Sequence, residues 1–311
     1  MLNISYTISP NLKVTLDKIE TQRRSLLLTP LSPKTELRLC WEAMLNRIYW
    51  SLSLTDNEIT KAEMVRLLIS HPAQELTSQE NEVIKYKKAF DYISENWLVT
   101  SRAVTSRTIF VLHEIACYGR PRASETTLRE FLEYLQASSE HPVIQAAIAQ
   151  LQLVYLSPFT DGNGRTARLL SYIFLYKSGY DFRGMLALEE YFRRDLVSFR
   201  ENTAKYIKGG NVTLWLEYFA NCVQTQLEKT LNDIYDNRFR VDVPASFLEL
   251  NDRQRAILAE LEAPGSTITN KKVQRQFKVS QITASRDLTK LTSLGLLFSH
   301  GKGRSVYYTK V

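Results

Sequence analysis

The chain has 311 residues, and its 44% hydrophobic and 23% charged residues are typical of a soluble globular protein. This composition excludes a disordered chain, and no run of about 18 uncharged apolar residues is present to form a membrane-spanning helix. The net charge of +7 resides in the last sixty residues, which hold 11 Lys and Arg against 4 Asp and Glu. We therefore expect a cytoplasmic protein, without a membrane partner, whose C-terminal part can meet a polyanion.

Helical patterns dominate the first 240 residues. Apolar residues recur three and four positions apart, as in Leu128, Phe131, Leu132 and Leu135, whereas strands are hard to find before residue 295. Among the Pro and Gly breakers, Val243-Pro244 is the preferred domain boundary. Three widely separated cysteines show no metal-ligand spacing and are expected to be reduced thiols: Cys40, Cys117 and Cys222.

Beyond that boundary the pattern predicts three short helices, over 252–263, 269–279 and 280–294. The third carries an apolar series of Ile282, Ala284, Leu288, Leu291 and Leu294. Two β-like runs follow at 296–299 and 305–308, joined by a glycine-containing turn at 301–304. This order is typical of a winged helix-turn-helix.

A winged helix can bind DNA, and it can also serve as a protein-docking or dimerisation module. For DNA binding, the third helix and the turn would supply these side chains to bases and phosphates: Gln281, Thr283, Arg286, Lys290, Lys302 and Arg304.

The most informative stretch is SPFTDGNGRTAR at 157–168. Gly162 and Gly164 lack Cβ atoms, so backbone N–H groups can form a concave nest at the start of a helix predicted over 164–177. A di- or triphosphate fits such a nest. The alternative is a solvated turn that caps a structural helix.

Charged residues beside this loop favour the phosphate interpretation. Arg165 and Arg168 lie three apart on the helix, on neighbouring surface positions, and can offer guanidinium groups to phosphate oxygens. Asp161 supplies an oxygen ligand of the kind that Mg²⁺ takes next to phosphates. Together these residues predict a site for a metal-nucleotide.

At this stretch the sequence resembles the Fic (Fido) family, whose motif reads His-Pro-Phe-x-(Asp/Glu)-Gly-Asn-Gly-Arg-x-x-Arg. Eight of the nine specified positions match, and the likeness covers roughly residues 40–225. The resemblance implies a mainly α fold: an N-terminal helical region over 1–95, a Fic-type helical bundle over 96–243, and a small α+β winged helix over 244–311.

The resemblance also implies an activity, the transfer of AMP from ATP to a Ser, Thr or Tyr hydroxyl of a target protein. On the family pattern, Mg²⁺ would be held by Asp161, and the nucleotide by Gly162, Asn163, Gly164, Arg165 and Arg168.

The exception in the motif is Ser157, which stands where the family has the histidine that takes the proton from the attacking hydroxyl. A serine hydroxyl is far too weak a base near pH 7, and losing a general base costs about 10² to 10⁴ in rate. The other histidines, His71, His113, His141 and His300, have structural interpretations, with His113 and His141 on or at the start of core helices. Transfer is therefore expected to be weak or lost.

Two further segments depart from the family pattern. Many members carry an inhibitory helix, (Ser/Thr)-x-x-x-Glu-(Gly/Asn), whose glutamate pairs with the second motif arginine. The best match here places Ser53, Asp56 and Asn57 at those positions, so an Asp56–Arg168 pair is expected to be weak or absent. The segment 118–130 is short for the hairpin with which members clamp a target peptide.

Three hypotheses follow from these patterns. The first is a nucleotide-binding pseudoenzyme. The second is an active protein adenylyltransferase in which Ser157 is tolerated or is itself modified. The third is a DNA-binding regulator that acts through the basic C-terminal domain. A homodimer is compatible with each.

Overall fold

The structure, a computed structural model, describes residues 4–55, 57–69, 75–123, 125–137, 140–181, 183–209, 211–238, 250–261, 266–293, 296–301 and 306–310. The chain divides into two compact units, one of residues 1–30 and 38–235 and the other of residues 31–37 and 236–311. The predicted boundary at Val243-Pro244 lies outside the described residues.

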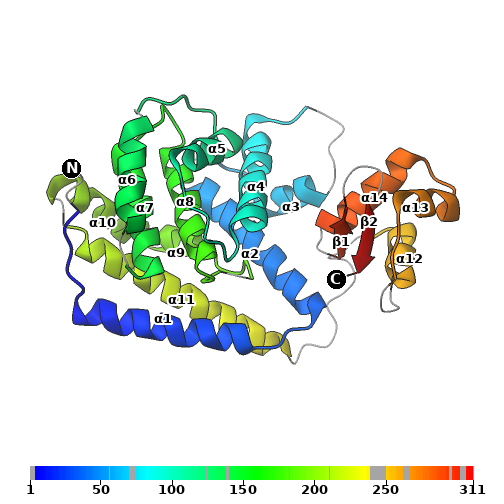
Figure 1. The fold of residues 1–311 in the computed structure, drawn as a ribbon, viewed down its shortest axis with the longest axis horizontal. Helices are drawn as coiled ribbons and strands as arrows, with labels where there is room; N and C mark the ends of the chain where they lie inside the picture. Colours follow the sequence, from blue (N-terminus) through cyan, green and yellow to red (C-terminus); the bar gives the residue numbers. More distant parts are fainter. Residues whose placement is uncertain are drawn as a thin grey trace. The chain divides into compact units, whose positions relative to one another are not determined.

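Figure 1 shows a mainly helical chain with one small pair of strands. The elements are α1 (Pro10–Leu28), α2 (Pro33–Ser53), α3 (Lys61–Ile69), α4 (Ser78–Trp97), α5 (Ser106–Ala116), α6 (Glu125–Ala137), α7 (Pro142–Leu156), α8 (Asn163–Lys177), α9 (Leu188–Arg194), α10 (Leu196–Gly209), α11 (Thr213–Arg238), α12 (Asp252–Glu260), α13 (Asn270–Phe277), α14 (Gln281–Ser293), β1 (Leu297–His300) and β2 (Tyr307–Lys310).

Helices α7 and α8 form the centre of the first unit and pack against each other (Figure 1). Every residue of α8 from 165 to 176 is buried, and α7 is buried continuously from 146 to 153. A helix that is buried on all sides belongs to a core, and here α4 and α5 cover further faces of α8. The loop between α7 and α8 is thereby fixed at both of its ends.

Helix α1 runs alongside α11 (Figure 1) and ties the start of the chain to this bundle. Ser9 caps α1 by accepting a hydrogen bond from the N–H of Leu12, and its hydroxyl donates to Glu217 of α11. One turn further along, the hydroxyl of Thr15 donates to Asn221 over 3.3 Å. Both helices therefore run in the same direction.

A buried ion pair between Arg47 of α2 and Asp181 holds the loop that follows α8. Arg47 also donates to the carbonyl of Leu186 and, over 3.1 Å, to the Tyr176 hydroxyl. Breaking such a pair by removing one partner costs about 3–5 kcal/mol, because the other charge stays buried. This loop leads into α9, so the pair positions α9 relative to α8.

The second unit contains α12, α13, α14 and the antiparallel pair of β1 and β2, in the predicted order. The observed helices are shorter than predicted, whereas β1 and β2 have the predicted length and begin one and two residues later than predicted. The core of the second unit is made of Leu250, Ile257, Leu261, Ile268, Val273, Ala284, Leu288, Leu291 and Leu297. Asp287 of α14 accepts hydrogen bonds from Arg253 and Gln254, which fixes α12 on α14.

Candidate functional site

The loop at 157–162 starts with Ser157, which ends α7. Ser157 has left-handed backbone dihedrals, φ 42° and ψ 57°, and its exposed hydroxyl donates to the carbonyl of Val154 over 2.6 Å. The residue therefore reverses the chain at the end of the helix. Its hydroxyl is not paired with a base among the described residues.

The loop is closed by a reciprocal clamp between Phe159 and Asn163. The N–H of Phe159 donates to Asn163 Oδ1, and Asn163 Nδ2 donates to the Phe159 carbonyl, both over 2.9 Å. Neutral hydrogen bonds of this kind contribute about 0.5–1.5 kcal/mol each. The sequence assigned Asn163 to the nucleotide, but in this structure its side chain shapes the loop.

His113 of α5 contacts the loop at Phe159 and Asp161. Its ring stacks on buried Phe159 with centroids 3.6 Å apart, and its Nε2 donates to the carbonyl of Asp161 over 3.0 Å. Burial lowers the pKa of His113, which favours the neutral ring. His113 lies in a core helix, as predicted, and the nitrogen nearest the loop is a donor rather than a base.

The two motif glycines have different environments. Gly162 has φ +77°, and a Cβ there would lie 2.5 Å from the Sγ of Cys117. Gly164 lies in the first turn of α8, and a Cβ there would meet only the end of the Arg168 side chain, at 3.4 Å. The fold thus requires glycine at 162 and leaves room for a methyl group at 164.

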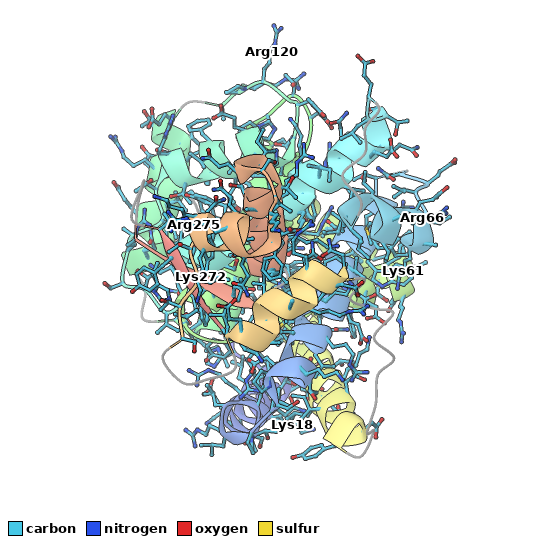
Figure 2. All side chains as sticks on the ribbon, turned by 90° about the vertical axis from the view of Figure 1, so that its right-hand side faces the viewer. Lys18, Lys61, Arg66, Arg120, Lys272 and Arg275 are labelled. Atoms are coloured by element: carbon cyan, nitrogen blue, oxygen red, sulfur yellow. The ribbon has the colours of Figure 1, made fainter. Side chains whose placement is uncertain are left out.

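The segment before α6 runs antiparallel to the loop. The N–H of Arg122 donates to the Pro158 carbonyl over 2.7 Å, and the N–H of Thr160 donates to the Arg120 carbonyl over 2.8 Å. The pairing is a single bridge between Pro121 and Phe159. Figure 2 shows the Arg120 side chain directed away from the ribbon, so it does not approach the loop nest.

The prediction that Arg165 and Arg168 occupy surface positions is wrong: they are 4% and 5% exposed. Helix α8 is buried on all sides, a property that the spacing of two arginines cannot reveal. Arg165 pairs with Glu82 of α4 over 2.7 Å and with Asp161 over 3.1 Å. Glu82 was missed from the sequence, because one glutamate in an amphipathic helix carries no distinguishing signal.

Arg168 is held by the end of α2. Its Nε donates to the Ser51 hydroxyl over 2.8 Å and its terminal nitrogen to the Ser51 carbonyl over 3.1 Å. The same hydroxyl donates to Tyr86 over 2.6 Å. Ser51 was not among the predicted site residues.

Two of the three predicted inhibitory residues, Ser53 and Asn57, form hydrogen bonds with groups other than Arg168. The Ser53 hydroxyl donates to the Trp50 carbonyl over 2.9 Å, and Asn57 donates to Glu82 over 2.8 Å. Asn57 therefore reaches Arg165 indirectly, through Glu82. Asp56 lies outside the described residues.

His141 does not lie at Ser157. His141 caps the start of α7, and Ser157 lies at its other end, 15 residues or about 22 Å away. His300 belongs to β1 of the second unit, and His71 lies outside the described residues.

A metal at this loop would have few protein ligands. The described part of the chain has no cluster of three or more His, Cys, Asp and Glu side chains that could hold a metal ion. The side chain of Asp161 is 69% exposed, with one oxygen accepting from Arg165. A single accessible carboxylate suits Mg²⁺, which takes one or two protein oxygens and fills the remaining positions with phosphates and water.

In the second unit, Gln281 and Arg286 are exposed on α14, as a DNA-contacting role requires. Thr283 is half-buried, and its hydroxyl pairs with the Ser280 hydroxyl at 2.9 Å. Lys290 is also half-buried and has an interaction partner. Lys302 and Arg304 lie outside the described residues.

The prediction that Ile282 belongs to the apolar core series of this helix is wrong, because its side chain is 66% exposed. Ala284, Leu288 and Leu291 form the buried face at spacings of four and three. Ile282 lies two positions before Ala284 and so points to another side of the helix.

Residues 86–175 match the family model described as the Fic/DOC family. The chain is similar to "Protein adenylyltransferase Fic" of Nematostella vectensis, 28% identical over 193 residues, covering 53% of this chain and 45% of that protein. The protein of the same name from Drosophila ananassae is 26% identical over 247 residues, with coverage of 71% and 47%. The chain thus spans about half the length of these curated relatives.

Solved structures of Fic proteins share the fold. A Fic family protein from Desulfovibrio desulfuricans G20 superimposes with a TM-score of 0.61 at 16% identity, over 98% of this chain and 97% of the other. Fic-1 of C. elegans gives a TM-score of 0.58 at 20% identity, over 71% and 72%. Among the described residues, no helix combines the length and apolar character needed to cross a bilayer.

Proposed function

Because residues 86–175 of this chain match the Fic/DOC family model, we propose that the chain binds ATP with Mg²⁺ at the loop 157–168 and transfers AMP weakly or not at all. The family relatives are protein adenylyltransferases, which implies a nucleotide and a protein hydroxyl as reactants. Ser157 replaces the proton acceptor of the motif. The proposal is therefore that the chain binds the nucleotide but does not transfer AMP efficiently.

The observation that carries the binding half of the proposal is the free space at Gly164. Glycine in a helix costs about 1 kcal/mol relative to alanine, and at this position the fold tolerates a Cβ. Glycine is favoured where a ligand must approach the backbone closely. Gly162, which caps α8, offers no side chain to the first-turn N–H groups, so these can point at phosphate oxygens.

The charged groups beside the loop support phosphate binding but are engaged with protein partners. Arg165 is bonded to Glu82 and Asp161, and Arg168 is bonded to Ser51. A phosphate that takes either guanidinium group must replace those contacts. Asp161 would supply Mg²⁺ with one carboxylate oxygen, and the bound ion would neutralise charge on the phosphates.

Weak transfer follows from the position of Ser157. Its hydroxyl donates to the Val154 carbonyl, and its oxygen is far too weak a base near pH 7 to take the proton of an attacking hydroxyl. Positioning and charge stabilisation remain available from the loop amides, and these supply much of the catalysis in phosphoryl-type transfer. We expect residual transfer reduced by about 10² to 10⁴ relative to a protein with a base at this position.

Calorimetry of the full chain with Mg-ATP tests binding, and intact-protein mass after incubation with Mg-ATP tests transfer. Saturable heat together with no added AMP mass is the expected result for the wild type. The Ser157→His variant should bind equally well and gain AMP mass, either on itself or on proteins of a lysate. Absence of binding in both proteins refutes the proposal, and efficient transfer by the wild type refutes its second half.

The second candidate function is duplex DNA binding by the C-terminal unit. Its support is the +7 balance of the last sixty residues together with Gln281 and Arg286 exposed at the start of α14. This order of helices and strands resembles that of a winged helix-turn-helix, whose recognition helix enters the major groove. Figure 2 also shows Lys272 and Arg275 on α13: Arg275 is exposed and can meet phosphates, whereas Lys272 is paired with Glu260 over 2.6 Å.

Fluorescence anisotropy with a mixed-sequence duplex at several salt concentrations tests this function. Phosphate contacts release counterions, so affinity should fall steeply as salt rises. The Arg275→Ala variant should bind more weakly at all sequences and show a smaller salt slope. Affinity that does not depend on salt, or no binding at low salt, contradicts DNA binding.

A further inference from the structure

An isoleucine is exposed on the basic helix α14, and neither nucleotide binding nor phosphate contact accounts for it. Ile282 is the second residue of α14 and has 66% of its surface accessible. Its neighbours on the same side are polar: Gln281, Ser285 and Arg286 are also exposed. A large apolar side chain in that setting suits a partner with a matching apolar group.

The exposed side of α14 carries two short side chains, so the helix can approach a groove closely. Ile282, Ser285, Arg286 and Thr289 follow one another at helical spacing, and Ser285 and Thr289 are short. The first turn is also fixed in place. Asn270 of α13 donates to the Gln281 carbonyl over 3.2 Å and to the Ser285 hydroxyl over 2.8 Å.

On the premise that the C-terminal unit binds duplex DNA, we propose that Ile282 reads thymine through its 5-methyl group in the major groove. The N-terminal residues of a recognition helix contact base edges, and apolar side chains contact the thymine methyl. Ile282 is the exposed apolar residue in the first turn of α14. It is therefore a specificity residue rather than a source of phosphate affinity.

Arg286 completes the contact one turn later. A guanidinium group pairs with O6 and N7 of guanine, and Arg286 is exposed on the same side of the helix as Ile282. Four residues of helix advance about 6 Å, which corresponds to about two base pairs. The preferred site should therefore contain a thymine and a guanine within about two base pairs of each other.

The test starts by selecting duplexes from a random library with the full-length protein. The selected site should contain the predicted thymine, and replacing that base by deoxyuridine removes only the methyl group. For the wild type this change should weaken binding by about fourfold, the effect of burying one methyl group. The Ile282→Ala variant should bind thymine and deoxyuridine sites equally and keep its salt dependence.

Val197→Ala is the matched control, because it shortens another β-branched side chain, 69% exposed, in α10. It should keep the wild-type response to deoxyuridine. If the wild type shows no salt-dependent duplex binding, both DNA binding and this inference fail. If it binds DNA but does not distinguish thymine from deoxyuridine, or if Ile282→Ala distinguishes them as the wild type does, only this inference is overturned.

Discussion

Replacing Gly164 with alanine tests whether glycine at this position serves ligand binding rather than the stability of the fold. The new Cβ would lie in the first turn of α8 with Arg168 as its nearest neighbour, at 3.4 Å, which is ordinary van der Waals contact. Alanine is a better helix former than glycine by about 1 kcal/mol in a helix interior. We therefore expect the free energy of unfolding to be unchanged or to rise by about 0.5 kcal/mol.

The same substitution should weaken nucleotide binding, although it leaves the fold equally or more stable. If phosphates lie against the first-turn N–H groups, the methyl group occupies their space, and overpacking of this kind costs about 1–3 kcal/mol. The affinity for Mg-ATP should accordingly fall by about 5- to 150-fold. Urea unfolding and calorimetry on the same preparation measure both quantities.

Gly162→Ala is the matched control, a glycine two residues away with a structural role. Its φ of +77° costs alanine about 1–2 kcal/mol, and its Cβ would lie 2.5 Å from Cys117 Sγ. This variant should lose about 2–4 kcal/mol of unfolding free energy. If Gly164→Ala loses a similar amount, or binds Mg-ATP like the wild type, the assignment of Gly164 to close ligand approach is refuted.

Three further predictions concern the loop, the side chain of Arg168 and the start of α7. Asn163→Ala removes both bonds of the clamp and should lower the unfolding free energy by about 1–3 kcal/mol in urea, whereas an unchanged value means that the clamp contributes nothing. Ser51→Ala frees Arg168 from its hydroxyl contact and should leave Mg-ATP affinity equal or higher in calorimetry; a tenfold loss would place Ser51 in the ligand site. Burial lowers the pKa of His141, whose Nδ1 caps α7. The free energy of unfolding should therefore be highest above pH 6.5 and fall as the pH drops below it. Urea unfolding of His141→Asn, which keeps a capping acceptor, should show a smaller loss.

The sequence could predict the helical character and the loop because both depend on local pattern. Apolar spacing of three and four residues indicates helices, and the stretch 157–168 places glycines, a proline and an asparagine where a tight turn needs them. The elements of the second unit follow the predicted order for the same reason. The predicted helix starts agree within one residue with those that the side-chain caps Asn251 and Thr269 set.

What the sequence could not predict depends on contacts between residues far apart in the chain. Arg165 and Arg168 looked like surface residues, since spacing on one helix says nothing of how many neighbours surround it. Their partners, Glu82 and Ser51, lie 83 and 117 positions away. Ile282 was placed in the core for the same reason, because a one-dimensional pattern gave no account of which side of α14 faces α12 and α13.

The sequence by itself therefore determined the resemblance to the Fic motif, the serine at position 157 where that motif has a histidine, and the concentration of positive charge in the last sixty residues. These are properties of residue identity and order. Tertiary structure decided that Asn163 and His113 build the loop and that both arginines are engaged with distant partners. It also decided that glycine is required at 162 but not at 164, because only packing reveals which atoms a side chain would meet.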